Sequence, residues 1–94
     1  MKTKPYETPA DPEAACDQAM LLLEHEQDAE ARQVLEPVLA AHPEHLRAHL
    51  YMAMALAKTD AEQASVHATH ALRDSDADRC KQAEALLRML SAEQ

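Results

Sequence analysis

The chain has 94 residues, enough for one small domain. It carries 17 Asp and Glu against 9 Lys and Arg, a formal net charge of −8 with neutral histidine, which argues against nucleic acid because phosphate binding needs clustered basic residues. It contains no glycine. Phosphate-binding loops, nucleophile elbows and dinucleotide-binding turns need glycine at fixed backbone positions, so these nucleotide-binding and hydrolase motifs are excluded.

Composition is compatible with two states of the chain. With 20 Ala, 12 Leu, only 3 Val and 2% aromatic residues, helix is favoured over strand. The shortage of branched apolar residues, combined with the net charge, is also typical of disorder. Because apolar and small residues recur at helical spacing along most of the chain, we predict an all-α fold.

The expected cellular setting follows from the cysteines and the apolar runs. No run reaches the roughly 18 to 20 apolar residues of a membrane span, and the start of the chain does not resemble a secretory signal. Two cysteines, Cys16 and Cys80, do not make a disulfide framework. A reducing, cytoplasmic location without a membrane span is therefore expected.

The first part of the chain is predicted to hold a flexible tail and one helix. Residues 1–11 contain Pro5 and Pro9 and lack periodicity. Asp11 followed by Pro12 is typical of a helix start. The apolar or small positions of this helix are Ala15, Ala19, Leu22 and Leu23.

A second helix is predicted after an interruption at Gln27 and Asp28, with Asp28 as its cap. It contains Pro37, which is expected to face solvent and to bend the end of the helix. Pro43 limits the helix to residues before it. Its apolar positions are Ala31, Val34, Leu35, Val38 and Leu39.

Three more helices are predicted in the second half. One opens at Pro43 and Glu44, one at Asp60, and one at Ser75, the last two with capping-box-like spacing. Their apolar positions are Ala48, Tyr51, Met52, Ala55 and Leu56, then Ala64, Ala68, Ala71 and Leu72, then Cys80, Ala83, Leu87 and Leu90. Short loops make neighbouring helices antiparallel, so five helices should form a run of hairpins.

The chain repeats itself at a spacing of about 33 residues. In the second helix of each copy, Ala31, Val38, Leu39 and Pro43 align with Ala64, Ala71, Leu72 and Asp76. In the first helix, Ala15, Ala19 and Leu22 align with Ala48, Met52 and Ala55. A helix–turn–helix period near 34 resembles the tetratricopeptide repeat.

This resemblance covers residues 12–94 and implies a short solenoid with repeats at 12–43 and 44–76 and a capping helix at 77–91. The chain departs from the family pattern at the hairpin turns, where Glu26 and Thr59 replace glycine, and at a small-residue position occupied by Met52. The many alanines imply a thin core and marginal stability without a partner or self-association.

In this family the first helices line a concave groove, so the resemblance implies a protein partner held there as an amphipathic helix or an extended apolar segment. The acidic balance favours a basic partner. The residues that the resemblance places at the binding site are Cys16, Met20, Leu23, Leu46, His49, Leu50, Ala53, Leu56, Gln82, Ala85 and Met89.

Function is left between two classes. The first is an adaptor or small chaperone, with a weaker resemblance to small type III secretion chaperones of bacteria in size, charge and groove character. The second is a self-associating structural module, a homo-oligomer without a peptide ligand. No catalytic residue, metal ligand or cofactor is predicted, because no acid, histidine or cysteine spacing stands out.

The histidines form two pairs at helical spacing. His45 and His49 are four residues apart, and His67 and His70 are three apart, so each pair can share one helix face. His49 is interpreted as a plain residue of the groove, with a pH-sensitive hydrogen-bonding role as the alternative.

Overall fold

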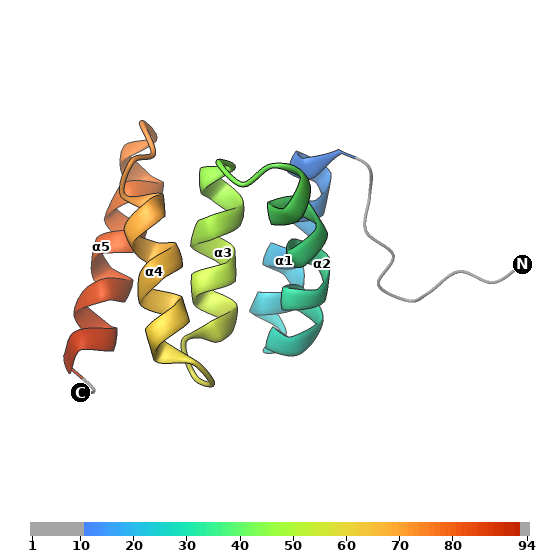
Figure 1. Cartoon of the computed structure of the whole chain (residues 1–94). Helices are drawn as coiled ribbons and strands as arrows, with labels where there is room; N and C mark the ends of the chain where they lie inside the picture. Colours follow the sequence, from blue (N-terminus) through green and yellow to red (C-terminus); the bar gives the residue numbers. More distant parts are fainter. Residues whose placement is uncertain (1–10, 93–94) are drawn as a thin grey trace, which may run out of the picture.

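The computed structural model describes residues 11–92, which form five α-helices with no strand among them, so the predicted all-α fold is confirmed (Figure 1). Ten of the eleven residues of the predicted tail lie outside the described residues, and the eleventh, Asp11, caps the first helix. The helices are α1 (Pro12–Glu24), α2 (Asp28–Ala41), α3 (Leu46–Leu56), α4 (Ala61–Ala71) and α5 (Ala77–Ala92).

Two of the predicted helix starts are confirmed by side-chain caps. The Asp11 carboxylate accepts the backbone N–H of Glu13 at 2.9 Å. The Asp60 carboxylate accepts the N–H of Gln63 at 3.1 Å. These aspartates satisfy N–H groups that have no partner within the helix.

The other predicted starts are displaced by one to three residues. Gln27 is the N-cap of α2, without a side-chain bond, and Asp28 lies inside the first turn. The cap of α3 is His45, whose Nδ1 accepts the N–H of Ala48. At α5, Asp76 takes the place expected for Ser75, because its carboxylate accepts the N–H groups of Asp78 and Arg79.

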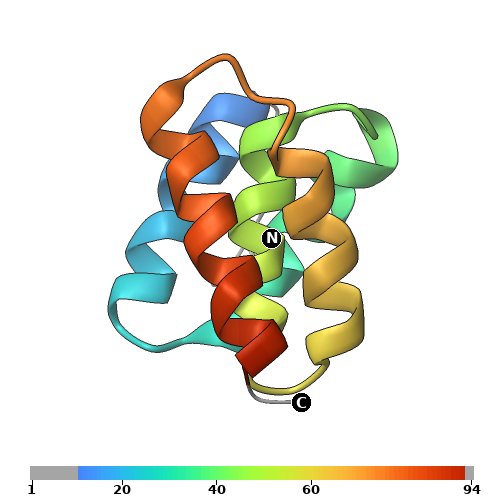
Figure 2. The same ribbon diagram turned by 90° about the vertical axis from the view of Figure 1, so that its left-hand side faces the viewer.

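The helices form two layers. Figure 2 shows α1, α3 and α5 on one side and α2 and α4 on the other. Helix α3 packs against each of the other four helices, and eight of its eleven residues are buried. It is therefore the central element, and most of the polar chemistry described below lies on its two sides.

The core is built largely from methyl groups. Of the 21 apolar residues buried within residues 11–92, ten are alanine, and α4 contributes only Ala64, Ala68 and Ala71. Such small side chains let helix backbones approach closely but bury little apolar area per residue. Pro37 is exposed within α2, on the solvent side as predicted. Among residues 11–92, no helix combines the length and the hydrophobicity that a bilayer crossing requires.

Candidate functional site

An apolar cleft lies between α1, α3 and α5 and encloses a cavity of about 280 Å³. Met20 and Met54 flank it and are 36% and 37% exposed, values high for large apolar side chains. The Tyr51 hydroxyl donates to the sulfur of Met20 at 3.4 Å. The lining residues are Met20, Leu23, Glu24, Tyr51, Met54 and Gln82. We call this feature the α1/α3/α5 cleft.

The structure divides the eleven predicted site residues into three groups. Met20, Leu23 and Gln82 line the cleft, while Ala85 and Met89 are exposed on α5 and Leu46 lines a different cavity. The remaining five have buried side chains that do not line the cleft, although His49 also borders the cavity that Leu46 lines. They are Cys16, His49, Leu50, Ala53 and Leu56.

A difference of one residue between the two hairpins explains the part of this division that concerns α3. Ala31 and Ala64 are equivalent buried positions 33 residues apart, but the equivalent cleft positions Met20 and Met54 are 34 apart. If the 33-residue spacing of the second helices is applied to the first helices, each cleft position of α1 is matched to an α3 residue one place too early. This error turns the assigned face of α3 by about 100°. The extra residue lies in the first hairpin, whose turn contains Glu26 in the left-handed conformation at φ 60°. Sequence reasoning therefore missed Tyr51 and Met54. A spacing of 34 residues would have found them, because it matches Met54 to Met20 and Tyr51 to Asp17.

A network of charged groups joins α1 to α3 beside the cleft. The Arg47 guanidinium donates to Glu13 at 2.8 Å and to Asp17 at 2.6 Å. It also lies over the Tyr51 ring, 5.3 Å from its centre. The hydrogen bond from Arg47 lowers the pKa of Glu13, against the opposing effect of its slight burial, and His45 lowers it further. We call Glu13, Asp17, His45 and Arg47 the Arg47 network.

The side chain of His45 lies between those of Cys16 and Glu13, so that Cys16 adjoins the Arg47 network. His45 Nε2 donates to Glu13 at 2.8 Å, and His45 Nδ1 lies 4.0 Å from the Cys16 sulfur. This order of thiol, imidazole and carboxylate resembles that of a thiol nucleophile. However, Nδ1 already accepts the N–H of Ala48, so it is occupied as a helix cap. Burial raises the pKa of the Cys16 thiol to about 11, so the group stays protonated and serves as a core contact.

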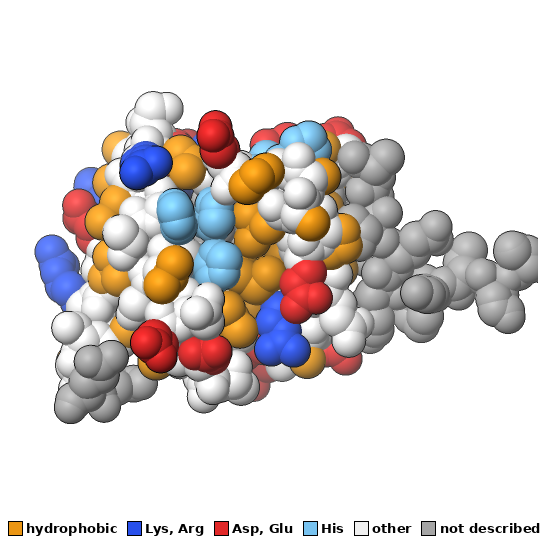
Figure 3. All heavy atoms as spheres, in the orientation of Figure 1, with side chains coloured by type: hydrophobic (Ala, Val, Ile, Leu, Met, Phe, Trp, Pro, Cys, Tyr) orange, Lys and Arg blue, Asp and Glu red, His pale blue; other side chains and the backbone are white. Residues whose placement is uncertain are grey.

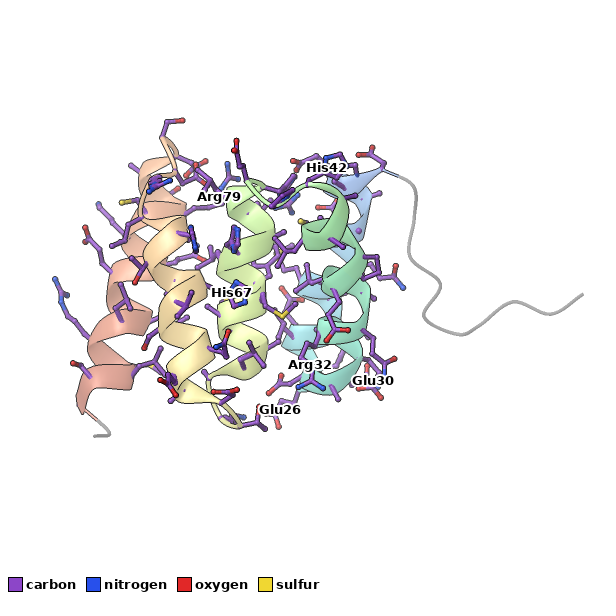
Figure 4. The ribbon with its side chains drawn as sticks, in the orientation of Figure 1. Glu26, Glu30, Arg32, His42, His67 and Arg79 are labelled. Carbon is purple, nitrogen blue, oxygen red and sulfur yellow. The ribbon has the colours of Figure 1, made fainter. Side chains whose placement is uncertain are left out.

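Three histidines gather on the other side of α3. His49 Nδ1 lies 2.9 Å from His67 Nδ1, and the His70 ring stacks on His49 with centres 4.6 Å apart. His49 Nε2 donates to the carbonyl of Pro43 at 2.7 Å. Figure 3 shows histidine side chains together over α3 and α4, and Figure 4 labels His67 between these helices. We call His49, His67 and His70 the histidine cluster.

The fold therefore does not keep His45 and His49 together, although their helical spacing in the sequence pairs them. His45 belongs to the Arg47 network, whereas His49 joins the two histidines of α4. A cavity of about 450 Å³ beside the cluster is lined by Pro43, Glu44, Leu46, His49, His70 and Arg73. Within residues 11–92, no group of three or more His, Cys, Asp or Glu has an arrangement that could hold a metal ion.

Fold and site together define an all-α protein of stacked helical hairpins with an apolar cleft on its three-helix layer. No family model, curated protein or solved structure matches this chain.

Proposed function

We propose that this chain is a protein–protein interaction module that holds a helix or an extended apolar segment of a partner in the α1/α3/α5 cleft. The observation that carries the proposal is the pair of exposed methionines flanking Tyr51 above a cavity of about 280 Å³. Methionine is flexible and polarisable, so such a surface adapts to the shape of an apolar ligand. The partly polar rim, with Glu24 and Gln82, suits an amphipathic segment.

The resemblance to the tetratricopeptide repeat supports this reading, since in that family the groove formed by the first helices receives the ligand. A net charge of −8 favours a partner segment with basic residues. Within this class we propose an adaptor or small chaperone of the reducing cytoplasm, of the kind that serves bacterial secretion or assembly systems. Two free cysteines, Cys16 buried and Cys80 half-buried, are consistent with a reducing compartment.

Two double variants test the cleft. Met20→Glu with Met54→Glu places two charges in it. Leu21→Glu with Val66→Glu places two charges on residues that are 55% and 45% exposed and are not among the cleft lining. Both variants should keep the helical circular dichroism of the parent chain, because all four positions are exposed.

The measurement is affinity purification from the native source, followed by calorimetry of each purified candidate partner with the three proteins. We expect one partner to bind the parent and the Leu21/Val66 variant equally and the Met20/Met54 variant at least tenfold more weakly. Equal affinity for both variants would contradict the proposal. Sedimentation of the parent alone addresses the alternative, because a homodimer that the Met20/Met54 variant dissociates would assign the cleft to self-association.

A further inference from the structure

We propose that the histidine cluster makes the packing of α4 against α3 sensitive to acid, so that protonation of the cluster between about pH 7 and pH 5 loosens α4 from α3. This inference is independent of the partner in the cleft. It rests on the hydrogen-bond order of the three rings, on the charges around them and on the thin core of α4.

The hydrogen bonds define which nitrogen of each ring carries a proton. Because a carbonyl only accepts, His49 Nε2 must carry the proton that it gives to Pro43. In the neutral His49 ring Nδ1 is then an acceptor, so His67 Nδ1 must be the donor of the 2.9 Å bond. The observed arrangement therefore accommodates His49 as a neutral ring between a carbonyl and an imidazole.

Adding protons disrupts this order. A proton on His49 Nδ1 turns this nitrogen into a donor, and the bond then persists only while His67 is neutral with its own proton on Nε2. The two rings therefore cannot both be charged and keep their bond. A charge on His70 would be added against the face of His49, with ring centres 4.6 Å apart. Burial lowers the pKa of both His49 and His67, and the charge that His70 would carry lowers both further. For His49 the bond to Pro43 acts in the opposite direction.

The surroundings offer little compensation for added positive charge. In the adjoining cavity Glu44 and Arg73 oppose each other in sign. On α1, Glu13 and Asp17 are bound by Arg47, which lies two residues and therefore about 200° around α3 from His49. On α2 Arg32 pairs with Glu36, and at the start of α5 Arg79 pairs with Asp74 (Arg32 and Arg79 are labelled in Figure 4).

Repulsion between the charged histidines is expected to weaken the packing of α4 against α3, because α4 buries only small side chains. Its buried residues are three alanines, so a modest electrostatic cost acts on an interface with little apolar burial. The sign follows from linkage: the folded state holds His49 and His67 neutral, so the unfolded chain binds more protons below the usual histidine pKa near 6.5. The contribution of these neutral histidines to the free energy of unfolding is fully present above that pH and is lost as the pH falls below it.

The test compares two double variants of the full chain that each remove two histidines. His67→Gln with His70→Gln breaks the cluster, and His25→Gln with His42→Gln removes exposed histidines outside it. His45, whose charge also lowers the pKa of His49, remains in both variants. Urea unfolding is followed by circular dichroism at pH 7.5, 6.5 and 5.5, with chelator present in every buffer.

For the parent and the His25/His42 variant we expect the unfolding constant to rise by at least tenfold from pH 7.5 to 5.5. For the His67/His70 variant the rise should be less than threefold. Amide exchange, corrected for intrinsic rates, should lose protection in α4 more than in α1 and α2. Equal pH slopes in the two variants, or a flat slope in the parent, would overturn the proposal.

If the His67/His70 variant does not fold, imidazole titration of the parent by NMR decides the question. His49 and His67 should titrate below the ordinary histidine pKa near 6.5. Titration of both rings at or above that value would equally overturn the proposal.

Discussion

The two sides of α3 use polar groups in opposite ways. Toward α1, Arg47 is permanently charged and is bound to Glu13 and Asp17. Toward α4, His49 is neutral and is bound to a carbonyl and to another imidazole. Arginine stays protonated at every pH that a cell reaches, whereas histidine changes charge near neutrality. One helix therefore has a junction that tolerates mild acid and a second junction that depends on the absence of protons.

The exposure of the two clusters differs as well. Glu13 and Asp17 have side chains that are 60% and 66% exposed, so water and salt weaken their attraction to Arg47. His49 is buried and His67 is half-buried, so a charge placed there is poorly solvated. We therefore expect the ion pairs at the rim to stabilise modestly over a wide pH range, and buried His49 with half-buried His67 to respond over a narrower one.

The largest effect is expected at a residue on which both junctions depend. Leu50 is fully buried in α3, in the core common to α1, α2 and α4. Leu50→Ala should lower the free energy of unfolding by about 3 kcal/mol, because a cavity is added to the lost apolar burial. Urea unfolding measures the change. Leu21→Ala, at an exposed leucine, should stay within about 0.5 kcal/mol, and an equal loss at both sites would show that the α3 core is not packed as described.

A smaller effect is expected from removing the charge on the α1 side. Arg47→Met keeps the apolar stem and should cost about 1 kcal/mol in low salt, because it removes the contact with Tyr51 and two ion pairs whose carboxylates are exposed. In 1 M NaCl the difference from the parent should shrink. The slope of stability between pH 7.5 and 5.5 should match that of the parent, and a change of slope would show that the two sides of α3 are coupled.

The smallest effect is expected from removing the charge of Glu13, and this effect should disappear at strongly acid pH. The pKa of Glu13 is lowered in the folded state by Arg47, so its contribution is present above the ordinary carboxyl pKa and is lost as pH falls below it. Glu13→Gln should therefore be less stable than the parent at pH 6 and equal to it near pH 2. Acid titration followed by circular dichroism measures both proteins, and a constant difference across this range would contradict the ionic origin of the effect.

Much of the fold was accessible to local reasoning. Alanine and leucine at helical spacing, the aspartate caps at Asp11 and Asp60, and short connections predicted five antiparallel helices. The weaker predictions were those on helix starts such as Asp28, because several polar residues in a row compete for one cap.

The site was only partly predictable. Met20, Leu23 and Gln82, three of the predicted partner-binding residues, line the cleft. The predicted face of α3 was rotated by one residue, so the cleft residues Tyr51 and Met54 were not among the predicted ones. In the histidine cluster, His49 and His67 are 18 positions apart in the sequence. Spacing within a single helix does not predict that these two side chains are in contact.

The amino-acid sequence alone determined the helical class, the hairpin order and the alanine-rich core, because these follow from periodicity, propensity and caps within single segments. Only the tertiary structure decided which face of α3 meets α1 and which meets α4. That choice depends on which side chains of α3 pack against each neighbour, because the 33-residue spacing of the second helices does not hold between α1 and α3, where the cleft residues Met20 and Met54 are 34 apart.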